Sequence, residues 1–353
     1  MKLHFMEGDV LNRNSLYEVQ RKLLPEMDDL LKKRFRLLQA IALQSPVGRR
    51  ALADILQLTE RDVRKETQVL SDQQLIQIQV KGMVCTELGY TVLEQLKTLF
   101  HELTGISKKE QQLKAALKIN QVIIVPSDIE QDVSTYALIG KEAASIVMQK
   151  AQPNCKIAVT GGTSVSSIGP YLQPHKALQN AQFIAARGGI GDEITMQANT
   201  LVAQFAEQCH ATYRTLFLPE HLSEQAYSAM KDEPIVKEMI ELYDNINIVI
   251  HGIGDAMEMA DRRQSSEEDK QLLLEKGAIG EAFGYYFDEQ GQIVHHIRTI
   301  GIQLEQVQQS DCIIAIAAGA SKAKSVQAYF KNPVRNTIFI TDESAANAIL
   351  ENL

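Results

Sequence analysis

The chain has 353 residues, of which 45% are hydrophobic, and a formal net charge of −8. This length predicts two domains with a sizeable core, and the charge argues against nucleic-acid binding along the whole chain. The apolar stretches are far shorter than the roughly 20 residues that span a bilayer, and the N-terminus shows no secretory signal pattern, so we expect a cytoplasmic protein with no membrane partner.

The charge is distributed unevenly along the chain. Between Lys32 and Lys65 there are nine basic and three acidic residues, a balance of 9 − 3 = +6, which leaves −14 for the remainder. A basic segment on an acidic chain indicates a polyanionic partner for that segment alone. The alternative is a solvated, charged helix face, and charge alone does not decide between the two.

Four helices are predicted in the first part of the chain. Leu16, Val19 and Leu23 recur at helical spacing, and a second helix with apolar residues on one face follows over residues 26–43. Two shorter helices, over residues 49–56 and 60–71, are joined by a tight turn. These two predict a helix-turn-helix.

The second of these short helices carries the signals of a recognition helix. Thr59 stands as its N-cap, with Asp62 three residues on, close to a capping box. The preceding turn lacks the glycine that is often present there. Basic and amide side chains lie on the outward face of this helix and at the start of the helix before it. The candidate DNA contacts are Arg49, Arg50, Arg61, Arg64, Lys65 and Gln68.

A predicted β-hairpin follows the recognition helix. Residues 75–80 alternate between apolar and polar, Lys81 and Gly82 form a turn, and residues 83–85 return. This hairpin is typical of a wing, and Lys81 is a further candidate DNA contact. Together with the basic window, it predicts operator double-stranded DNA as a partner. A small helical domain that contacts proteins is the alternative.

Assembly and domain division follow from the helices on either side of this motif. Helix-turn-helix repressors read two half-sites through a symmetric assembly. The apolar helices over residues 16–23 and 93–103 exceed what a small domain needs, so we expect a homodimer or homotetramer; packing within one chain is the alternative. A break near Gly105 predicts a winged helix-turn-helix domain over residues 1–105 and an α/β domain over residues 106–353.

The second domain alternates strands and helices. Near-continuous apolar runs predict parallel strands that are covered on both faces. Strands are expected at residues 122–126, 156–159, 183–186, 215–219, 246–250, 312–317 and 337–341. Helices are expected at residues 136–148, 193–208 and 266–276, with a hairpin at residues 282–294.

Four of these strands run into glycine-bearing loops. The loops are Thr160-Gly161-Gly162-Thr163-Ser164, Arg187-Gly188-Gly189-Ile190-Gly191, His251-Gly252-Ile253-Gly254-Asp255 and Ala318-Gly319-Ala320-Ser321-Lys322. Loops at the carboxyl ends of parallel strands line one crevice. Backbone N–H groups at a helix start, with Arg187 and Lys322, favour an anionic small molecule there. The alternative for the Gly161 loop is a tight strand–helix turn with nothing bound.

In this order, the motifs resemble the SorC family of sugar-responsive bacterial repressors. The resemblance covers nearly the whole chain and implies an effector domain similar to sugar-phosphate isomerases and glucosamine-phosphate deaminases. Besides the winged helix-turn-helix, the resemblance rests on Thr160-Gly161-Gly162-Thr163, Arg187-Gly188-Gly189, Gly252-Ile253-Gly254, Ala318-Gly319-x-x-Lys322-Ala323 and Ile340-Thr341-Asp342-Glu343. Ala320 departs from the second glycine that is usual in the fourth of these loops.

The resemblance also implies a function and a set of contacts. It implies repression of a glycolytic operon, with fructose 1,6-bisphosphate as the inducer. Gly161, Gly162, Thr163 and Ser164 match the phosphate loop of the family. Arg187, Arg262 and Lys322 match its cationic contacts, and Gln197 and Glu281 match its polar contacts to the sugar.

Two other classes of function remain open from the sequence. The chain could be an active sugar-phosphate isomerase or deaminase with an accessory DNA-binding domain, with Asp255 and Glu281 as candidate catalytic groups, although no convincing acid–base constellation stands out. A purely structural interaction protein is the third class. The four cysteines are far apart and the histidines form no metal-binding motif, so we expect no metal and no cofactor besides the effector.

Overall fold

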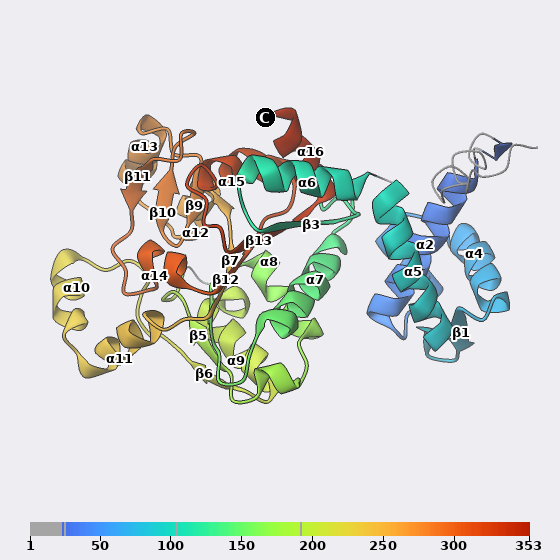
Figure 1. The fold of residues 1–353 in the computed structure, drawn as a ribbon, viewed down its shortest axis with the longest axis horizontal. Coiled ribbons are helices and arrows are strands. Elements are labelled where there is room, and N and C mark those ends of the chain that lie inside the picture. The colour runs from blue at the N-terminus through green and yellow to red at the C-terminus, as the bar shows by residue number, and fades with distance from the viewer. Residues whose placement is uncertain (1–22, 25, 104, 191–192) are drawn as a thin grey trace, which may run out of the picture. The chain divides into compact units, whose positions relative to one another are not determined.

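The computed structural model describes residues 23–24, 26–103, 105–190 and 193–353. The chain divides into two compact units between Ile106 and Ser107, next to the boundary between residues 105 and 106 that the sequence predicts (Figure 1). The predicted helix around Leu16 and Val19 lies outside the described residues.

The first unit is a winged helix-turn-helix, as predicted. Its core holds one buried stripe from each helix, with Leu38 and Ile41 packed beside Leu52 and Val63. The elements are α2 (Glu26–Gln44), α3 (Arg49–Leu56), α4 (Glu60–Asp72), β1 (Ile76–Gln79), β2 (Gly82–Cys85) and α5 (Glu87–Leu103).

The turn between α3 and α4 works without a glycine. Gln57 takes the left-handed conformation at φ 53°, and its side-chain amide donates a hydrogen bond to the Asp54 carbonyl at 2.8 Å. Thr59 then caps α4, since its hydroxyl accepts from the Asp62 N–H at 3.1 Å. Local hydrogen bonds therefore hold the turn that a glycine would otherwise favour.

A glycine is required at the wing. Val47 pairs with Met83 as an additional bridge beside the β1–β2 hairpin. Gly82 has φ 135°, and a Cβ there would lie 2.9 Å from the Val47 backbone. The close approach of the two backbones leaves the turn residues Val80 and Lys81 exposed at the tip of the wing.

The second unit is built on a seven-stranded parallel sheet in the order β3-β13-β12-β7-β4-β5-β6. The chain runs outward through β4, β5 and β6 and returns to β7 on the other side of β4. The point between β4 and β7 is therefore the topological switch, where open parallel sheets form ligand crevices. The strands are β3 (Gln121–Val125), β4 (Lys156–Val159), β5 (Gln182–Ala185), β6 (Thr212–Arg214), β7 (Ile248–Gly252), β12 (Cys312–Ile316) and β13 (Thr337–Asp342).

Helices cover this sheet. Every residue of β12 and β13 is buried, which is the pattern of central parallel strands covered on both faces. The helices are α6 (Ile106–Leu117), α7 (Thr135–Lys150), α8 (Thr163–Ser166), α9 (Ala198–Cys209), α10 (Glu224–Lys231), α11 (Pro234–Tyr243), α14 (Leu304–Gln309), α15 (Ala323–Tyr329) and α16 (Glu343–Glu351).

A small antiparallel sheet extends the predicted hairpin. It has the order β11-β10-β9-β8 and packs against α15 (Figure 1). With α12 and α13 it encloses its own core around Ala256, Ala260 and Tyr286. Its elements are β8 (Gly254–Asp255), α12 (Ala256–Arg262), α13 (Glu267–Glu275), β9 (Gly280–Ala282), β10 (Tyr285–Phe287) and β11 (Ile293–His296). We refer to these six elements as the small-sheet module.

Two predicted elements differ from the structure. The strand expected at residues 215–219 lies instead at β6 (Thr212–Arg214), an exposed edge strand. The apolar run forms the connection after β6, where the Asn199 side chain hydrogen-bonds both the N–H and the carbonyl of Leu216. The helix expected from residue 193 begins at Ala198, after a 3₁₀ turn over Ile194–Met196.

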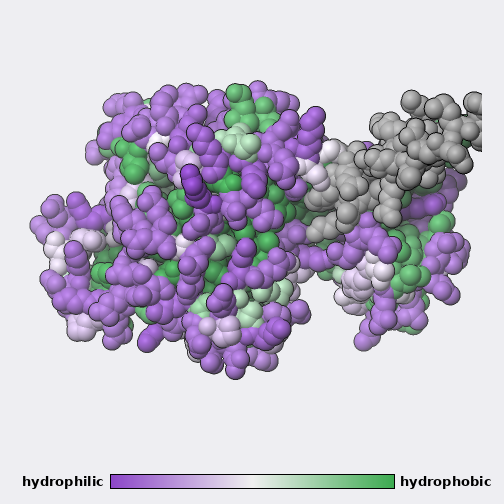
Figure 2. Space-filling view, viewed as in Figure 1, coloured by the Kyte–Doolittle hydropathy of each residue, from purple (hydrophilic) through white to green (hydrophobic). Residues whose placement is uncertain are grey.

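Hydrophilic residues cover most of the visible face of the second unit, with hydrophobic residues in smaller groups between them (Figure 2). None of the described helices is both long and apolar enough to cross a bilayer.

Candidate functional site

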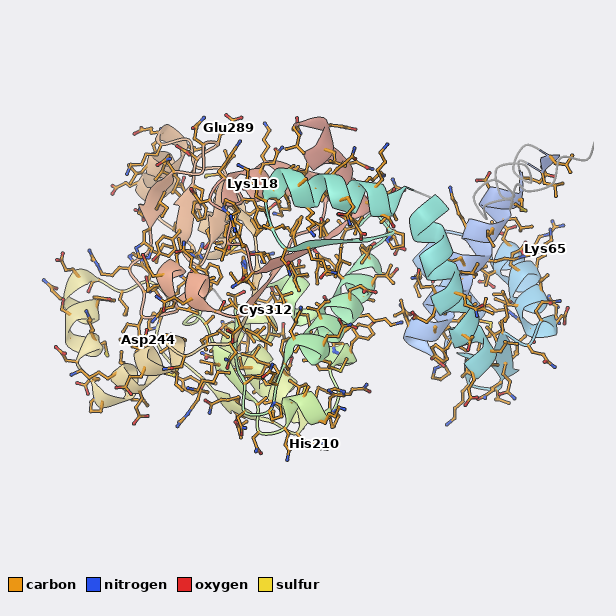
Figure 3. All side chains as sticks on the ribbon, viewed as in Figure 1. Lys65, Lys118, His210, Asp244, Glu289 and Cys312 are labelled. Atoms are coloured by element: carbon orange, nitrogen blue, oxygen red, sulfur yellow. The ribbon has the colours of Figure 1, made fainter. Side chains whose placement is uncertain are left out.

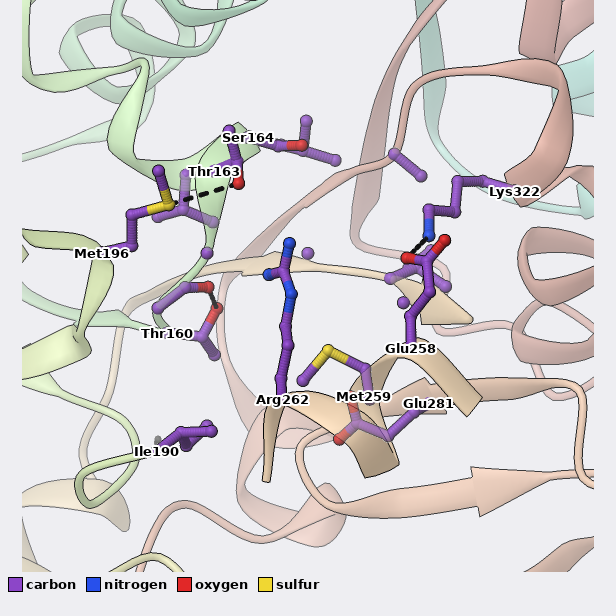
Figure 4. Close-up of a pocket in the computed structure, with 18 of the residues that line it drawn as sticks. Thr160, Thr163, Ser164, Ile190, Met196, Glu258, Met259, Arg262, Glu281 and Lys322 are labelled. Carbon is purple, nitrogen blue, oxygen red and sulfur yellow. Dashed lines mark hydrogen bonds and ion pairs between the residues drawn. The ribbon is translucent and has the colours of Figure 1, made fainter. Parts of the chain in front are cut away.

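The predicted crevice is present as a cavity of about 650 Å³. Residues of all four glycine-bearing loops line it (Figure 4), because β4, β5, β7 and β12 end at the same edge of the sheet. Gly191 lies outside the described residues. A cavity of this size accommodates a small molecule such as a phosphorylated sugar.

The loop after β4 forms one wall of the cavity. Gly161 passes so close to the Met196 carbonyl that a Cβ would lie 2.6 Å from it, and Gly162 has φ 118°. The Gly162 N–H donates to the same carbonyl at 2.9 Å. The N–H groups that open α8, together with the hydroxyls of Thr163 and Ser164, supply donors for an anion.

The Arg187 loop has a structural reason for its glycines. Gly189 and Glu220 pair backbone to backbone, since the Glu220 N–H donates to the Gly189 carbonyl at 3.1 Å. A side chain at Gly188 would collide with the Leu218 carbonyl. This pairing brings the Glu220 carboxylate against the Arg187 guanidinium, and the two form an ion pair with side chains that are each 3% exposed.

Arg187 and Glu220 belong to a larger buried network, which we call the wall network: Arg187, Glu220, Arg263, Glu281 and Tyr286. Arg263 donates to Glu220 at 2.7 Å, to Glu281 at 2.9 Å and to the Tyr286 hydroxyl at 3.1 Å. Burial alone would raise the pKa of the Glu220 carboxyl, but the Arg187 and Arg263 charges outweigh it and hold the pKa below its ordinary value. Burial lowers the pKa of Arg187, and Glu220 partly opposes that effect.

Arg262 and Lys322 point at the cavity from different elements. Arg262 is exposed and rises from the end of α12 into the middle of the cavity (Figure 4). Lys322 ends the 3₁₀ turn Ala320–Lys322 that follows β12, and its ammonium pairs with Glu258 of α12. Both cations come from positions that the sequence singles out.

Gln197 and Glu281 line the same cavity. The Gln197 amide lies 3.5 Å from the Ile190 carbonyl, and Glu281 accepts hydrogen bonds from Arg263 and the Gly284 N–H. The structure therefore gathers all nine predicted effector residues around one space. Contact of each with an effector stays a prediction.

Two charged residues of the wall network, Glu220 and Arg263, and the role of Asp342 were not predicted from the sequence. Glu220 follows Pro219 in an irregular segment, and Arg263 looks like a surface charge beside Arg262. Asp342 is fully buried. Its carboxylate accepts from the Gly319 N–H at 2.9 Å, from the Ile129 N–H at 2.9 Å and from the Ala345 N–H at 3.1 Å. Asp342 therefore ties the loops after β3 and β12 together.

His251 lies buried behind the cavity. Its ring lies tilted against that of Phe283, with 4.5 Å between centroids, and its Nδ1 lies 3.0 Å from the Gly252 carbonyl. Burial lowers the pKa of His251 to about 4, so the ring is neutral near pH 7. Among the described residues, no group of three or more His, Cys, Asp and Glu side chains could hold a metal ion.

The candidate DNA surface is exposed on the first unit. The seven predicted contacts on α3, α4 and the wing are all exposed, and Lys65 is labelled on α4 (Figure 3). Two other members of the basic window are paired within the unit. Arg34 donates to the buried Glu66 at 2.8 Å, and Lys33 lies 3.6 Å from Asp62. Asp62 is already counted in the +6 balance, whereas Glu66 lies just outside the window and lowers it to 9 − 4 = +5. DNA contact stays a prediction.

Two family models match the chain in sequence. A model of a sugar-binding domain matches residues 101–351, and a model of the CggR N-terminal DNA-binding domain matches residues 30–100. The central glycolytic genes regulator of Priestia megaterium is 40% identical over 339 residues, which cover 96% of this chain and 99% of that protein.

Solved structures show the same architecture. A SorC family transcriptional regulator from Enterococcus faecalis is 35% identical, with a TM-score of 0.65, and the match covers 69% of this chain and 99% of that one. The full-length sorbitol operon regulator SorC from Klebsiella pneumoniae matches 97% of this chain and 100% of that chain, with a TM-score of 0.63 and 17% identity. The latter likeness shows the fold alone.

We expect Asp342→Asn to destabilise the second unit by about 1–3 kcal/mol. The amide oxygen can still accept from Gly319 and Ala345, but the amide nitrogen replaces the acceptor of the Ile129 N–H and leaves that group unpaired. Thermal unfolding measures the loss. The control is Glu343→Gln, whose partly exposed pair with Lys109 should contribute less than about 1 kcal/mol. Equal stability of both variants would contradict the role assigned to Asp342.

We expect the stability of the second unit to fall between pH 6.5 and pH 4 partly through His251. The unfolded imidazole takes up a proton below its ordinary pKa of 6.5, whereas the folded one resists until about 4. The neutral ring therefore contributes stability above pH 6.5, and about 3 kcal/mol of it is lost as the pH falls to 4. Denaturant titrations should show a shallower pH dependence for His251→Gln. The same slope in both proteins would refute the burial argument.

Proposed function

The chain belongs to the central glycolytic genes regulators of the SorC family, and we propose that it represses a glycolytic operon until fructose 1,6-bisphosphate occupies its cavity. As a member it is a regulator of glycolytic genes with a DNA-binding and a sugar-binding domain. The identity of the effector, the homo-oligomeric assembly and the absence of catalysis are what we propose.

The observation that carries the choice of effector is the arrangement of donors around the cavity. The loop before α8 lies on one side, Lys322 on another, and Arg262 reaches in between them (Figure 4). Two phosphates need two sets of donors, and a ligand with a phosphate at each end can use both. Gln197 also lines the cavity and is a polar candidate for contact with the hydroxyls of the sugar.

Regulation is favoured over catalysis by the state of the two candidate catalytic carboxylates. The Asp255 carboxylate caps α12 through the N–H groups of Met257 and Glu258, at 2.9 and 3.1 Å. Glu281 is held by Arg263 in the wall network. A general base must be able to reach a substrate proton and accept it, and these hydrogen bonds compete with that role. We therefore propose binding of a sugar phosphate without turnover.

The exposed side chains of α4 support recognition of DNA in the major groove. Arg64, Lys65 and Gln68 project from the face of α4 that is opposite its buried residues. Lys81 extends the contact at the wing. Because such motifs read paired half-sites, we propose a homodimer or homotetramer on the operator. The segments expected to pair lie largely outside the described residues and side chains.

Release of DNA requires a difference in affinity. The effector shifts the equilibrium only if it binds the DNA-incompetent assembly better than the competent one. A bisphosphate that contacts Gly162, Lys322 and Arg262 would join the main sheet to the small-sheet module, and so favour one arrangement of the two. We propose that this arrangement is the one that leaves the operator.

We expect the protein to shift DNA from upstream of its own operon, and fructose 1,6-bisphosphate to reverse the shift. Arg262→Ala should require about ten to a hundred times more effector, since it loses one charge-assisted phosphate contact of about 1.5–3 kcal/mol. Operator affinity without effector should be unchanged. Arg262 is preferred to Arg187 for this test because loss of Arg187 would leave Glu220 short of a partner in the wall network.

The matched control for Arg262→Ala is Arg298→Ala, an exposed arginine that does not line the cavity. It should respond to effector as the unmodified protein does. If Arg262→Ala left the DNA at the effector concentration that releases the unmodified protein, the effector would bind elsewhere.

We expect Arg64→Ala to weaken operator binding by about 1–3 kcal/mol if the side chain is bidentate to a guanine. Its loss should reduce discrimination between operator and unrelated DNA. Arg50→Ala, at the start of α3, should instead weaken both to a similar extent and reduce the dependence of affinity on salt, as expected for a phosphate contact. Anisotropy titrations at several salt concentrations measure both effects. Unchanged operator affinity in Arg64→Ala would exclude this face of α4 from the interface.

A further inference from the structure

An ion pair joins two of the residues that line the effector cavity. Glu258 lies in the first turn of α12, and its carboxylate pairs with the ammonium of Lys322 (Figure 4). The Glu258 side chain is 56% exposed, whereas that of Lys322 is 18% exposed. The pair joins two separately packed parts, because α12 belongs to the small-sheet module and Lys322 follows β12 of the main sheet.

Glu258 differs from other carboxylates that line the cavity in the cation that it pairs with. Glu220 and Glu281 are neutralised by buried arginines of the wall network. Asp261 pairs with Lys270 of α13 at 2.8 Å, and Lys270 does not line the cavity. Glu258 instead neutralises Lys322, a cation that faces the space where a ligand would bind.

We propose that Glu258 sets the affinity of the cavity for phosphates: its carboxylate occupies Lys322 in place of an effector phosphate and must be displaced when the effector binds. This inference rests on the sugar-phosphate function proposed above. The Lys322 ammonium is a compact point charge, so an anion that takes it from Glu258 must offer more than one carboxylate does. A phosphate with a charge of about −1.5 to −2 offers more, whereas a neutral sugar or a sugar acid does not.

The position of Arg262 extends the effect to the whole ligand. Glu258 and Arg262 are four residues apart on α12, so they lie on the same face of the helix. Displacement of Glu258 from Lys322 releases α12 from the turn after β12, while a second phosphate meets Arg262 on the same helix. Glu258 therefore weakens the binding of every ligand whose phosphate takes Lys322, by the free energy of the ion pair that must be broken.

The test is calorimetric titration of the full chain with fructose 1,6-bisphosphate and, separately, with fructose 6-phosphate. Glu258→Gln keeps the shape of the side chain and removes its charge. It should tighten binding of both ligands about fivefold, the upper range for a partly exposed ion pair. Asp261→Asn is the matched control, with the same change of charge on the same helix away from Lys322, and should change affinity by less than about twofold.

A second comparison separates the pair from the general field of the cavity. In a Lys322→Met background, Glu258→Gln should change the affinity by less than about twofold, because the pair that it breaks is already absent. The inference is overturned if Glu258→Gln leaves the affinity unchanged or weakens it, or if Asp261→Asn tightens binding as much as Glu258→Gln does. It is also overturned if Glu258→Gln still tightens binding about fivefold in the Lys322→Met background. If the unmodified chain binds neither ligand, the proposed effector fails, and the inference fails with it.

Discussion

The effector cavity depends on the pairing of buried opposite charges in its wall. Arg187 follows β5, Glu220 follows β6, Arg263 follows α12 and Glu281 lies in β9, so the wall network joins the main sheet to the small-sheet module. Each of these charges would be costly to bury alone, and removal of one partner leaves another charge buried and unpaired. Arg262 on α12 and Lys322 in the turn after β12 are the two predicted effector cations that lie outside the wall network.

Much of the architecture could be predicted from local patterns. The apolar runs of β4, β5, β7 and β12 predicted a parallel sheet covered on both faces, and loops at the carboxyl ends of parallel strands lie at one edge. The recognition helix could also be predicted, because its N-cap Thr59 and its buried stripe from Val63 to Leu70 are signals that belong to one element. The glycine-bearing loops with Arg187 and Lys322 followed from the same patterns, whereas Gln197, Arg262 and Glu281 came only from the resemblance to the family.

The remainder depended on pairings between distant segments. Arg263 and Glu220 are 43 residues apart, and Asp342 reaches Ile129 across 213 residues, so no spacing along the chain indicates either contact. β8 has two residues and β9 has three, which is too short for a period to be detected. The strand predicted over residues 215–219 was wrong because β-propensity describes a half-buried surface, and that apolar run lies in a connection instead.

The small-sheet module lies between β7 and β12 in the chain, and this placement bears on how new specificities arise. The glycine-bearing loop before α8 and the Asp342 contacts belong to the main sheet, while Glu258 and Arg262 belong to α12. A regulator of this construction can change the ligand that it recognises by substitutions along one short helix, without disturbing the strands that hold the rest of the site. Diversification of sugar sensors from this scaffold, in nature or by engineering, therefore has a natural starting point at α12.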